Sequence, residues 1–126
     1  MFSHITVGTN DLQRAGDFYD AVLGALGHAR GFERENFISY GDRSGGRFFV
    51  MNPFDGNAAT VGNGGHAAFN ADSRAAVDKF HAAALAGGGT DEGRPGLRPH
   101  YNENYYGAYV RDPDGNKLQA VCHNAE

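Results

Sequence analysis

The chain has 126 residues, of which 40% are hydrophobic and 21% are charged, and its formal net charge is −4. This length fits one domain, the acidic charge argues against a nucleic-acid-binding surface, and no apolar stretch approaches the roughly 18 residues that cross a membrane. The single cysteine, Cys122, excludes an internal disulfide and is typical of a reducing compartment, so a cytoplasmic location is expected.

The first half of the chain predicts a strand, a helix and three further strands. Alternating β-branched residues predict the strand over residues 2–8. Apolar residues that recur every three or four positions between Leu12 and Leu26 predict the helix, which ends at glycines. The three strands are then expected near 29–34, 36–41 and 47–52, with 42–46 as the last hairpin turn.

The second half repeats this order after a polar, glycine-rich link over 55–65. A strand at 66–70 is followed by a helix that Asp72 caps. The apolar side of this helix includes Leu85, while His81 is expected to be exposed. A strand within 90–95 leads into an inserted loop over 94–104, and strands over 105–110 and 117–123 complete the half.

An internal duplication relates the two halves. His4 opens the first copy and His66 the second, 66 − 4 = 62 positions apart, and the offset grows to 119 − 49 = 70 between Phe49 and Gln119. The second copy therefore carries 70 − 62 = 8 additional residues. Two such copies predict an α+β fold in which tandem βαβββ modules form a curved mixed sheet cup with the helices outside. The single domain is expected to comprise module one over about 1–54, the link 55–65 and module two over about 66–126.

Strand alternation selects the residues that face the cup. The apolar alternates of the first strand pack under the helix, so His4 faces the open side, and by the repeat His66 faces it from module two. With Gln119 assigned to the same side of the last strand, the cup contains two imidazoles and one amide, and Phe49 takes the fourth equivalent position. Such residues can hold a metal ion, but strand histidines can equally line a ligand cup or make local polar contacts.

Several short motifs accompany the duplication: HITV at 4–7, DL at 11–12, FY at 18–19, LG at 23–24 and, above all, DPDGN at 112–116 before the last strand. On these residues, and over essentially its whole length, the chain resembles the vicinal oxygen chelate superfamily. That group includes glyoxalase I, the bleomycin and fosfomycin resistance proteins and the extradiol dioxygenases. The resemblance implies a divalent metal ion (Zn, Fe, Mn or Ni) in the cup, with ligand positions at His4, His66, Gln119 and Phe49.

The ligand set that the resemblance implies departs from the family pattern. Phe49 has no donor atom, so the four-ligand glyoxalase pattern is broken. The metal ligands His4, His66 and Gln119 look more like the two-histidine-one-carboxylate set of the extradiol dioxygenases. An amide in place of the carboxylate removes a negative charge beside the ion and weakens its binding. Gln119 can instead hydrogen-bond a water or a substrate oxygen.

The inserted loop and the residue after it carry Arg94, Arg98, His100, Tyr101 and Tyr105. Arginine forks onto carboxylate or phosphate groups, and tyrosine offers a flat contact and a hydroxyl, so Arg94, Arg98 and Tyr105 are expected to bind an anionic, partly apolar small molecule under a lid. The alternative is that the tyrosines pack against the sheet or that the loop covers a neighbouring subunit. His100 and Tyr101 are the candidate catalytic residues for proton transfer, because imidazole titrates near neutral pH.

Two functions remain open on this resemblance. The first, which the paired histidines favour and which is the expected function, is a metal-dependent lyase or isomerase, or an extradiol-type dioxygenase, that acts on a small molecule. The second is a metal-free binding protein of the bleomycin-resistance type. This alternative is favoured by the neutral Gln119 and by Phe49, which would then form a wall of the ligand site. The resemblance also implies a homodimer, and each cup forms either within one chain or across two.

Overall fold

A computed structural model describes every residue from Met1 to Glu126. Its elements follow one another as β1 (His4–Gly8), α1 (Leu12–Gly24), β2 (Arg30–Arg34), β3 (Phe37–Asp42), β4 (Gly46–Met51), β5 (Ala67–Asn70), α2 (Arg74–Ala86), β6 (Thr90–Leu97), β7 (Tyr106–Arg111) and β8 (Lys117–Cys122). Two four-stranded sheets result, sheet one in the order β1-β4-β3-β2 and sheet two in the order β5-β8-β7-β6. The predicted α+β fold with two βαβββ modules is confirmed.

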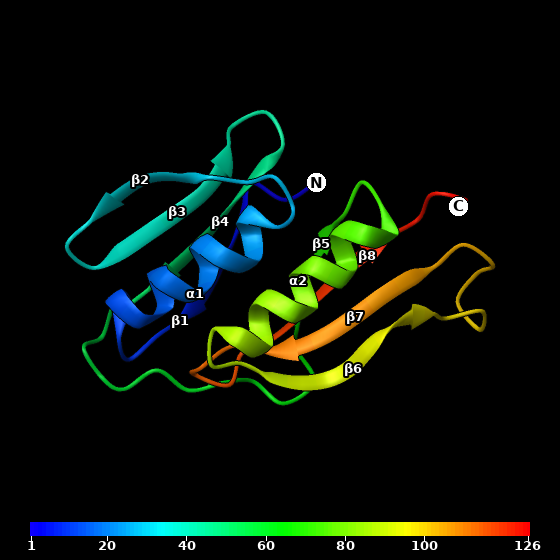
Figure 1. The fold of residues 1–126 in the computed structure, drawn as a ribbon. Coiled ribbons are helices and arrows are strands. Elements are labelled where there is room, and N and C mark those ends of the chain that lie inside the picture. Colours follow the sequence, from blue (N-terminus) through cyan, green and yellow to red (C-terminus); the bar gives the residue numbers. More distant parts are fainter.

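The two helices lie next to each other on the same side of both sheets (Figure 1). Asp11 caps α1, because its carboxylate accepts a hydrogen bond from the Arg14 backbone N–H at 3.0 Å. Ser73 caps α2 through a hydroxyl that accepts from the Ala76 N–H at 3.1 Å. The prediction of Asp72 as this cap is wrong, since Ser73 is the last extended residue before the helix. Neither helix is long and apolar enough to cross a membrane.

Two side chains of α2 differ from the sequence prediction. Leu85 is 44% exposed, whereas His81 is buried and its Nε2 lies 2.8 Å from a carboxylate oxygen of Asp91 on β6. Hydrogen bonds from His81 and from the Gly93 N–H hold the pKa of Asp91 below its ordinary value. A polar residue is thus buried on this helix because β6 supplies its partner, which helical spacing alone does not reveal.

One hydrophobic core extends through both modules. Phe48 of β4 meets Phe69 of β5 with ring centroids 5.1 Å apart and nearly perpendicular planes. Phe69 in turn lies 6.4 Å from the ring of Phe80 on α2. Edge-to-face contacts at such distances add to the stabilisation that burial of the rings provides. The helix-bearing faces of both sheets therefore pack around a common interior.

The turn between β7 and β8, residues 112–116, joins the two modules through buried polar contacts. The Asp112 carboxylate is 4% exposed and accepts from the Tyr19 hydroxyl of α1 at 2.5 Å and from the Asn116 amide at 2.8 Å. The same Asn116 amide donates to the Gly8 carbonyl at the end of β1, also at 2.8 Å. Gly115 has φ +93°, a conformation that favours glycine, and this shapes the turn.

Asp114 in the same turn makes a second connection to module one. Its carboxylate accepts from the Thr9 hydroxyl at 2.5 Å and from the Asn10 N–H at 3.0 Å. The Arg14 guanidinium adds an ion pair at 3.1 Å. The sequence predicts this turn only as a hairpin connection. Its contacts also fix the position of module two against the start of α1.

Alkaline pH should destabilise the protein through its buried tyrosines. Burial, and then the neighbouring Asp112 carboxylate, raises the pKa of Tyr19 well above its ordinary value. Burial, and then a hydrogen bond to Asp20, does the same for the pKa of Tyr40. Because the folded chain holds these protons more tightly than the unfolded chain, the free energy of unfolding should fall as pH rises above about 10.

Urea denaturation between about pH 8 and about pH 11 checks this expectation, with a lower midpoint expected at the higher pH. Tyr19→Phe removes one of the two phenols, so its midpoint should change less with pH than that of the unmodified chain. Equal pH dependence of the two proteins would show that Tyr19 has no part in the effect.

Candidate functional site

Each sheet has one face under the helices and one open face. On β4, Phe48 and Val50 are buried in the core, so Arg47 and Phe49 lie on the opposite, open face. The parallel register pairs His4 of β1 with Arg47 and Thr6 with Phe49, which puts His4 on the open face as well. On sheet two, Leu118 and Ala120 of β8 belong to the core, and Gln119 lies on the open face.

Three phenylalanines form a cluster on the open face of sheet one. The rings of Phe37 and Phe49 are 5.5 Å apart, and both lie near Phe32 of β2, at 5.6 Å and 6.1 Å respectively. The His4 ring meets Phe49 at 5.2 Å. We call Phe32, Phe37 and Phe49 the phenylalanine cluster. Sequence reasoning identified only Phe49, although the alternation of β3, with Ile38 buried, already places Phe37 on the open side.

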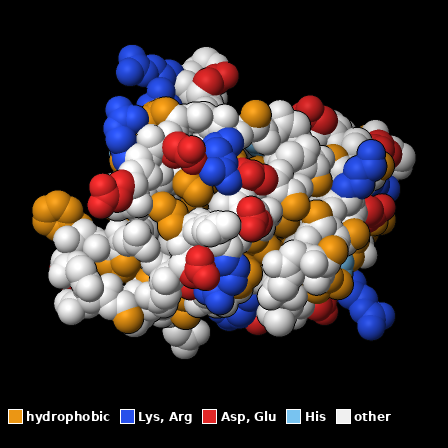
Figure 2. Space-filling model, turned by 60° about the vertical axis from the view of Figure 1, so that its left-hand side comes forward, with side chains coloured by type: hydrophobic (Ala, Val, Ile, Leu, Met, Phe, Trp, Pro, Cys, Tyr) orange, Lys and Arg blue, Asp and Glu red, His pale blue; other side chains and the backbone are white.

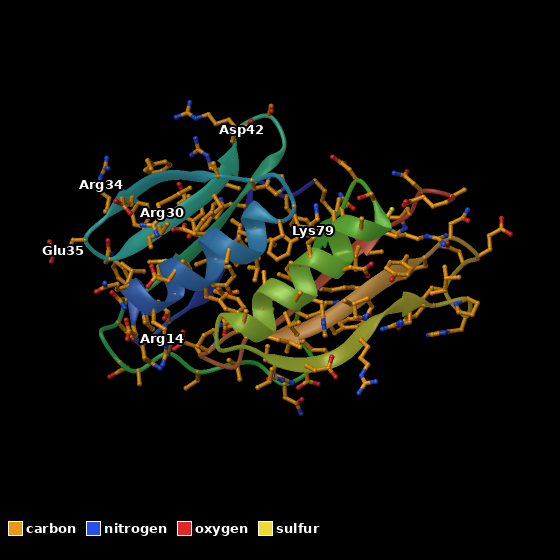
Figure 3. All side chains as sticks on the ribbon, viewed as in Figure 1. Arg14, Arg30, Arg34, Glu35, Asp42 and Lys79 are labelled. Carbon is orange, nitrogen blue, oxygen red and sulfur yellow. The ribbon has the colours of Figure 1, made fainter.

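Basic side chains flank this cluster. The guanidinium of Arg47 lies 5.1 Å and that of Arg34 5.8 Å from the centroid of the Phe32 ring, within the range of cation–π contact. Figure 3 shows Arg34 near the end of β2, whereas Arg30 of the same strand points toward α1 and pairs with Asp20 at 2.8 Å. Only the residues on the open side of β2 therefore contribute to the cluster.

A hollow of about 650 Å³ adjoins the cluster at the start of β1 and the β3–β4 hairpin. It is lined by Met1, Phe2, Ser3, His4, Arg43, Ser44, Gly45, Gly46, Arg47 and Phe49. His4, Arg47 and Phe49 connect the hollow to the open face of sheet one. We call it the hairpin hollow. Figure 3 shows Asp42 at the beginning of the same hairpin.

The open face of sheet two is covered by tyrosines. Gln119 lies between Ala68 of β5 and Tyr109 of β7, is 1% exposed, and donates from Nε2 to the Tyr105 hydroxyl at 2.6 Å. His66, just before β5, lies on this face with its ring 5.7 Å from Tyr109. Burial, and then the hydroxyls of Tyr101 and Tyr105, raises the pKa of Tyr109 to about 12.

The loop after β6 supplies two of these tyrosines. The rings of Tyr101 and Tyr105 are 4.9 Å apart, and the His100 ring lies 4.2 Å from that of Tyr101, tilted by 46°. On its other side Tyr105 meets the ring of His123 at 5.2 Å. The candidate catalytic residues His100 and Tyr101 therefore belong to an aromatic layer in which Tyr105 contacts Gln119.

Arg94 and Arg98 differ in their availability to a ligand. The strand expected within 90–95 continues to Leu97, so Arg94 lies on β6 rather than in a loop, and it is exposed. The guanidinium of Arg98 donates to the Gly96 carbonyl at 3.0 Å and to the Arg94 carbonyl at 2.8 Å. These contacts stabilise the irregular end of β6, where the register with β7 shifts. Arg98 is thus largely engaged by its own backbone.

The residues of one chain do not fit the metal centre that the family resemblance implies. His4 lines the hairpin hollow, whereas His66 lines a second hollow of about 310 Å³ between β1 and the starts of β5 and β8. No three His, Cys, Asp or Glu side chains of the chain form a group suited to a metal ion. The Phe49 side chain has no atom that can coordinate a metal ion, and the Gln119 amide nitrogen donates a hydrogen bond to the Tyr105 hydroxyl.

Comparison with known proteins connects this geometry to a family. The family model described as Glyoxalase/Bleomycin resistance protein/Dioxygenase superfamily matches residues 1–120. The chain belongs to this superfamily. The crystal structure of a glyoxalase/bleomycin resistance protein from Albidiferax ferrireducens T118 is similar to this chain. The two sequences are 44% identical, and the TM-score is 0.90 over 98% of this chain and 99% of that one.

Two solved structures of lower sequence identity share the fold. A glyoxalase-related enzyme from Fulvimarina pelagi is 24% identical, with a TM-score of 0.74 over 97% of this chain and 87% of that one. A lactoylglutathione lyase from Agrobacterium tumefaciens is 19% identical, with a TM-score of 0.67 over 97% and 92% of the two chains. Among curated proteins none matches the chain. The glyoxalase-like fold is therefore established by both family model and structure.

Proposed function

We propose that this superfamily member binds a small organic molecule at the open face of its sheets and does so without a resident metal ion, as a binding protein of the bleomycin-resistance type. The observation that carries the proposal is the position of Phe49. It stands where the family resemblance puts a metal ligand, and its ring packs with His4 and the rest of the phenylalanine cluster. The position is therefore built for aromatic contact rather than for coordination.

The chemistry around the cluster suits a ligand of low molecular mass. Small-molecule sites are mostly apolar concavities of about 300–1,000 Å³ with a few polar groups that fix orientation. The hairpin hollow, at about 650 Å³, falls within this range of volumes, but it is more polar than such sites, since only three of its ten lining residues are hydrophobic. Its polar groups include the His4 imidazole and the Arg47 guanidinium, and Phe49 provides an apolar wall.

A second function, a divalent-metal lyase, isomerase or dioxygenase, is favoured by the histidines. His66 makes no hydrogen bond within the chain, and His4 uses only Nδ1, with Ser3 at 2.8 Å. Each imidazole thus keeps a nitrogen for an ion. Because the two lie in different hollows, the ion would be held in a homodimer by His4 of one chain with His66 and Gln119 of the other. Such an ion supplies Lewis-acid polarisation of substrate oxygens.

Elemental analysis of purified, untagged protein separates the two functions. Far less than one divalent ion per chain is expected, also after incubation with Zn²⁺, Mn²⁺ or Ni²⁺ and desalting. A stoichiometric ion that His4→Ala and His66→Ala each release, and that the control His28→Ala retains, would establish the metal enzyme instead. His28 is a suitable control because it is exposed in the connection between α1 and β2 and lines neither hollow.

A further inference from the structure

We propose that the hairpin hollow binds an aromatic carboxylate, with the carboxylate held by Arg43 and Arg47 and the aromatic ring placed against Phe49. This inference rests on the proposed function, because it names the class of ligand that the open face of sheet one would take. It does not involve the loop after β6, where sequence reasoning expected an anionic group to bind.

The first support is positive charge without an ion-pair partner, since Arg47 acts on the Asp42 carboxylate only from beyond ion-pair distance. The ion pairs of the chain involve Arg14, Arg30, His81 and Arg111, and neither Arg43 nor Arg47 belongs to any of them. Both line the same hollow. A guanidinium fork matches a carboxylate with two parallel hydrogen bonds, and such charge-assisted bonds are stronger than neutral ones.

The nearest hairpin carboxylate is already satisfied. Asp42 accepts from the Ser44 N–H at 2.8 Å, from the Ser44 hydroxyl, and from the Gly45 N–H at 3.2 Å. It lies within ion-pair distance of neither Arg43 nor Arg47. An incoming anion therefore does not have to displace an internal ion pair to reach these guanidinium groups.

The second support is the aromatic wall beside the charge. Phe49 lines the hollow and belongs to the phenylalanine cluster, so a further ring at Phe49 would extend an existing set of aromatic contacts. Arg47 is half-buried and its guanidinium stacks on Phe32, which limits its freedom before any ligand binds. The Arg47 guanidinium and the Phe49 ring thus line the same hollow. An aromatic carboxylate could contact the first with its carboxylate and the second with its ring.

The test uses benzoate and two matched compounds in isothermal titration with the full chain. Benzamide keeps the ring and removes the charge, and cyclohexanecarboxylate keeps the charge and removes the aromatic ring. Benzoate should bind at least about tenfold more tightly than either. Arg47→Gln should weaken benzoate binding about tenfold, and Phe49→Leu should abolish the preference for benzoate over cyclohexanecarboxylate.

The control Lys79→Gln removes one positive charge from α2 (Figure 3) and should leave benzoate binding unchanged. Lys79 is exposed, does not line the hairpin hollow and, like Arg47, takes part in no ion pair. Amide chemical shifts should change at 43–47 rather than at 66–68. Binding of benzamide as tight as benzoate, shifts confined to 66–68, or no binding of benzoate would each overturn the inference. None of these results affects the proposed function, which the metal analysis tests by itself.

Discussion

Replacing Asp112 with alanine should lower the free energy of unfolding by about 3–5 kcal/mol, a large part of what a domain of this size possesses. The carboxylate is buried and accepts from the Tyr19 hydroxyl, the Asn116 side chain and two backbone N–H groups of its own turn. Alanine removes the acceptor of the buried Tyr19 hydroxyl and of the Asn116 N–H, and each buried donor without a partner costs about 1–3 kcal/mol, while the Asn116 amide keeps its bond to the Gly8 carbonyl.

Urea denaturation of Asp112→Ala measures this loss. Asp55→Ala is the matched control, because Asp55 is fully exposed in the link and bonds only to the Asn57 N–H two residues away. Its midpoint should stay close to that of the unmodified chain. Tyr19→Phe removes one donor and should have an intermediate effect. A loss for Asp112→Ala no larger than that for Asp55→Ala would mean that the turn does not join the modules.

Gly89→Ala should cost about 2–3 kcal/mol, because the added methyl group has no room. A Cβ at Gly89 would lie 2.5 Å from the Arg111 carbonyl oxygen, and 2.9 Å from both the Ala84 carbonyl oxygen and a ring carbon of Phe18. The Gly89 N–H also donates to Ala84 at 2.8 Å, which holds the chain close to the end of α2. Neither backbone carbonyl can move without disturbing α2 or β7.

Thermal and urea denaturation of Gly89→Ala are to be compared with those of Gly24→Ala. Gly24 ends α1, and a Cβ there would meet nothing within 4 Å. Alanine favours helix over glycine by up to about 1 kcal/mol, so Gly24→Ala should be neutral or slightly stabilising. If both variants are equally stable, the strand β6 can shift away from Arg111 and the packing at Gly89 is looser than the structure indicates.

Local patterns in the sequence predict most elements of the fold. Apolar spacing of three and four residues marks both helices. On the first strand the alternation is only partly right, because Val7 packs against the core whereas Ile5, expected under the helix, is 39% exposed. Such patterns report on the immediate neighbourhood of a residue. They do not reveal that His81 is buried, because its partner Asp91 lies on another element and burial depends on that contact.

The candidate site depends on how the two sheets and the loop after β6 are placed relative to each other, and the alternation of residues along a strand does not give this information. The repeat identifies equivalent residues on each sheet, yet it does not say how the sheets are placed relative to each other, and His4 and His66 line separate hollows of the chain. The sequence does not single out Arg43 and Arg47, since what distinguishes them from other surface arginines is that both line one hollow beside Phe49. The aromatic layer around Gln119 likewise requires a loop to fold back onto β8.

The two copies of the β-hairpin turn have come to serve different ends. Asp112 is sealed inside the molecule and bonded to Tyr19, while Asp42, its counterpart seventy positions earlier (112 − 42 = 70), remains at the surface and contacts only its own hairpin. Substitution of Asp112 is therefore expected to disturb folding, whereas Arg43 takes part in no ion pair and its replacement should cost little stability. One copy of the turn thus anchors the two modules to each other, and the other borders the hairpin hollow.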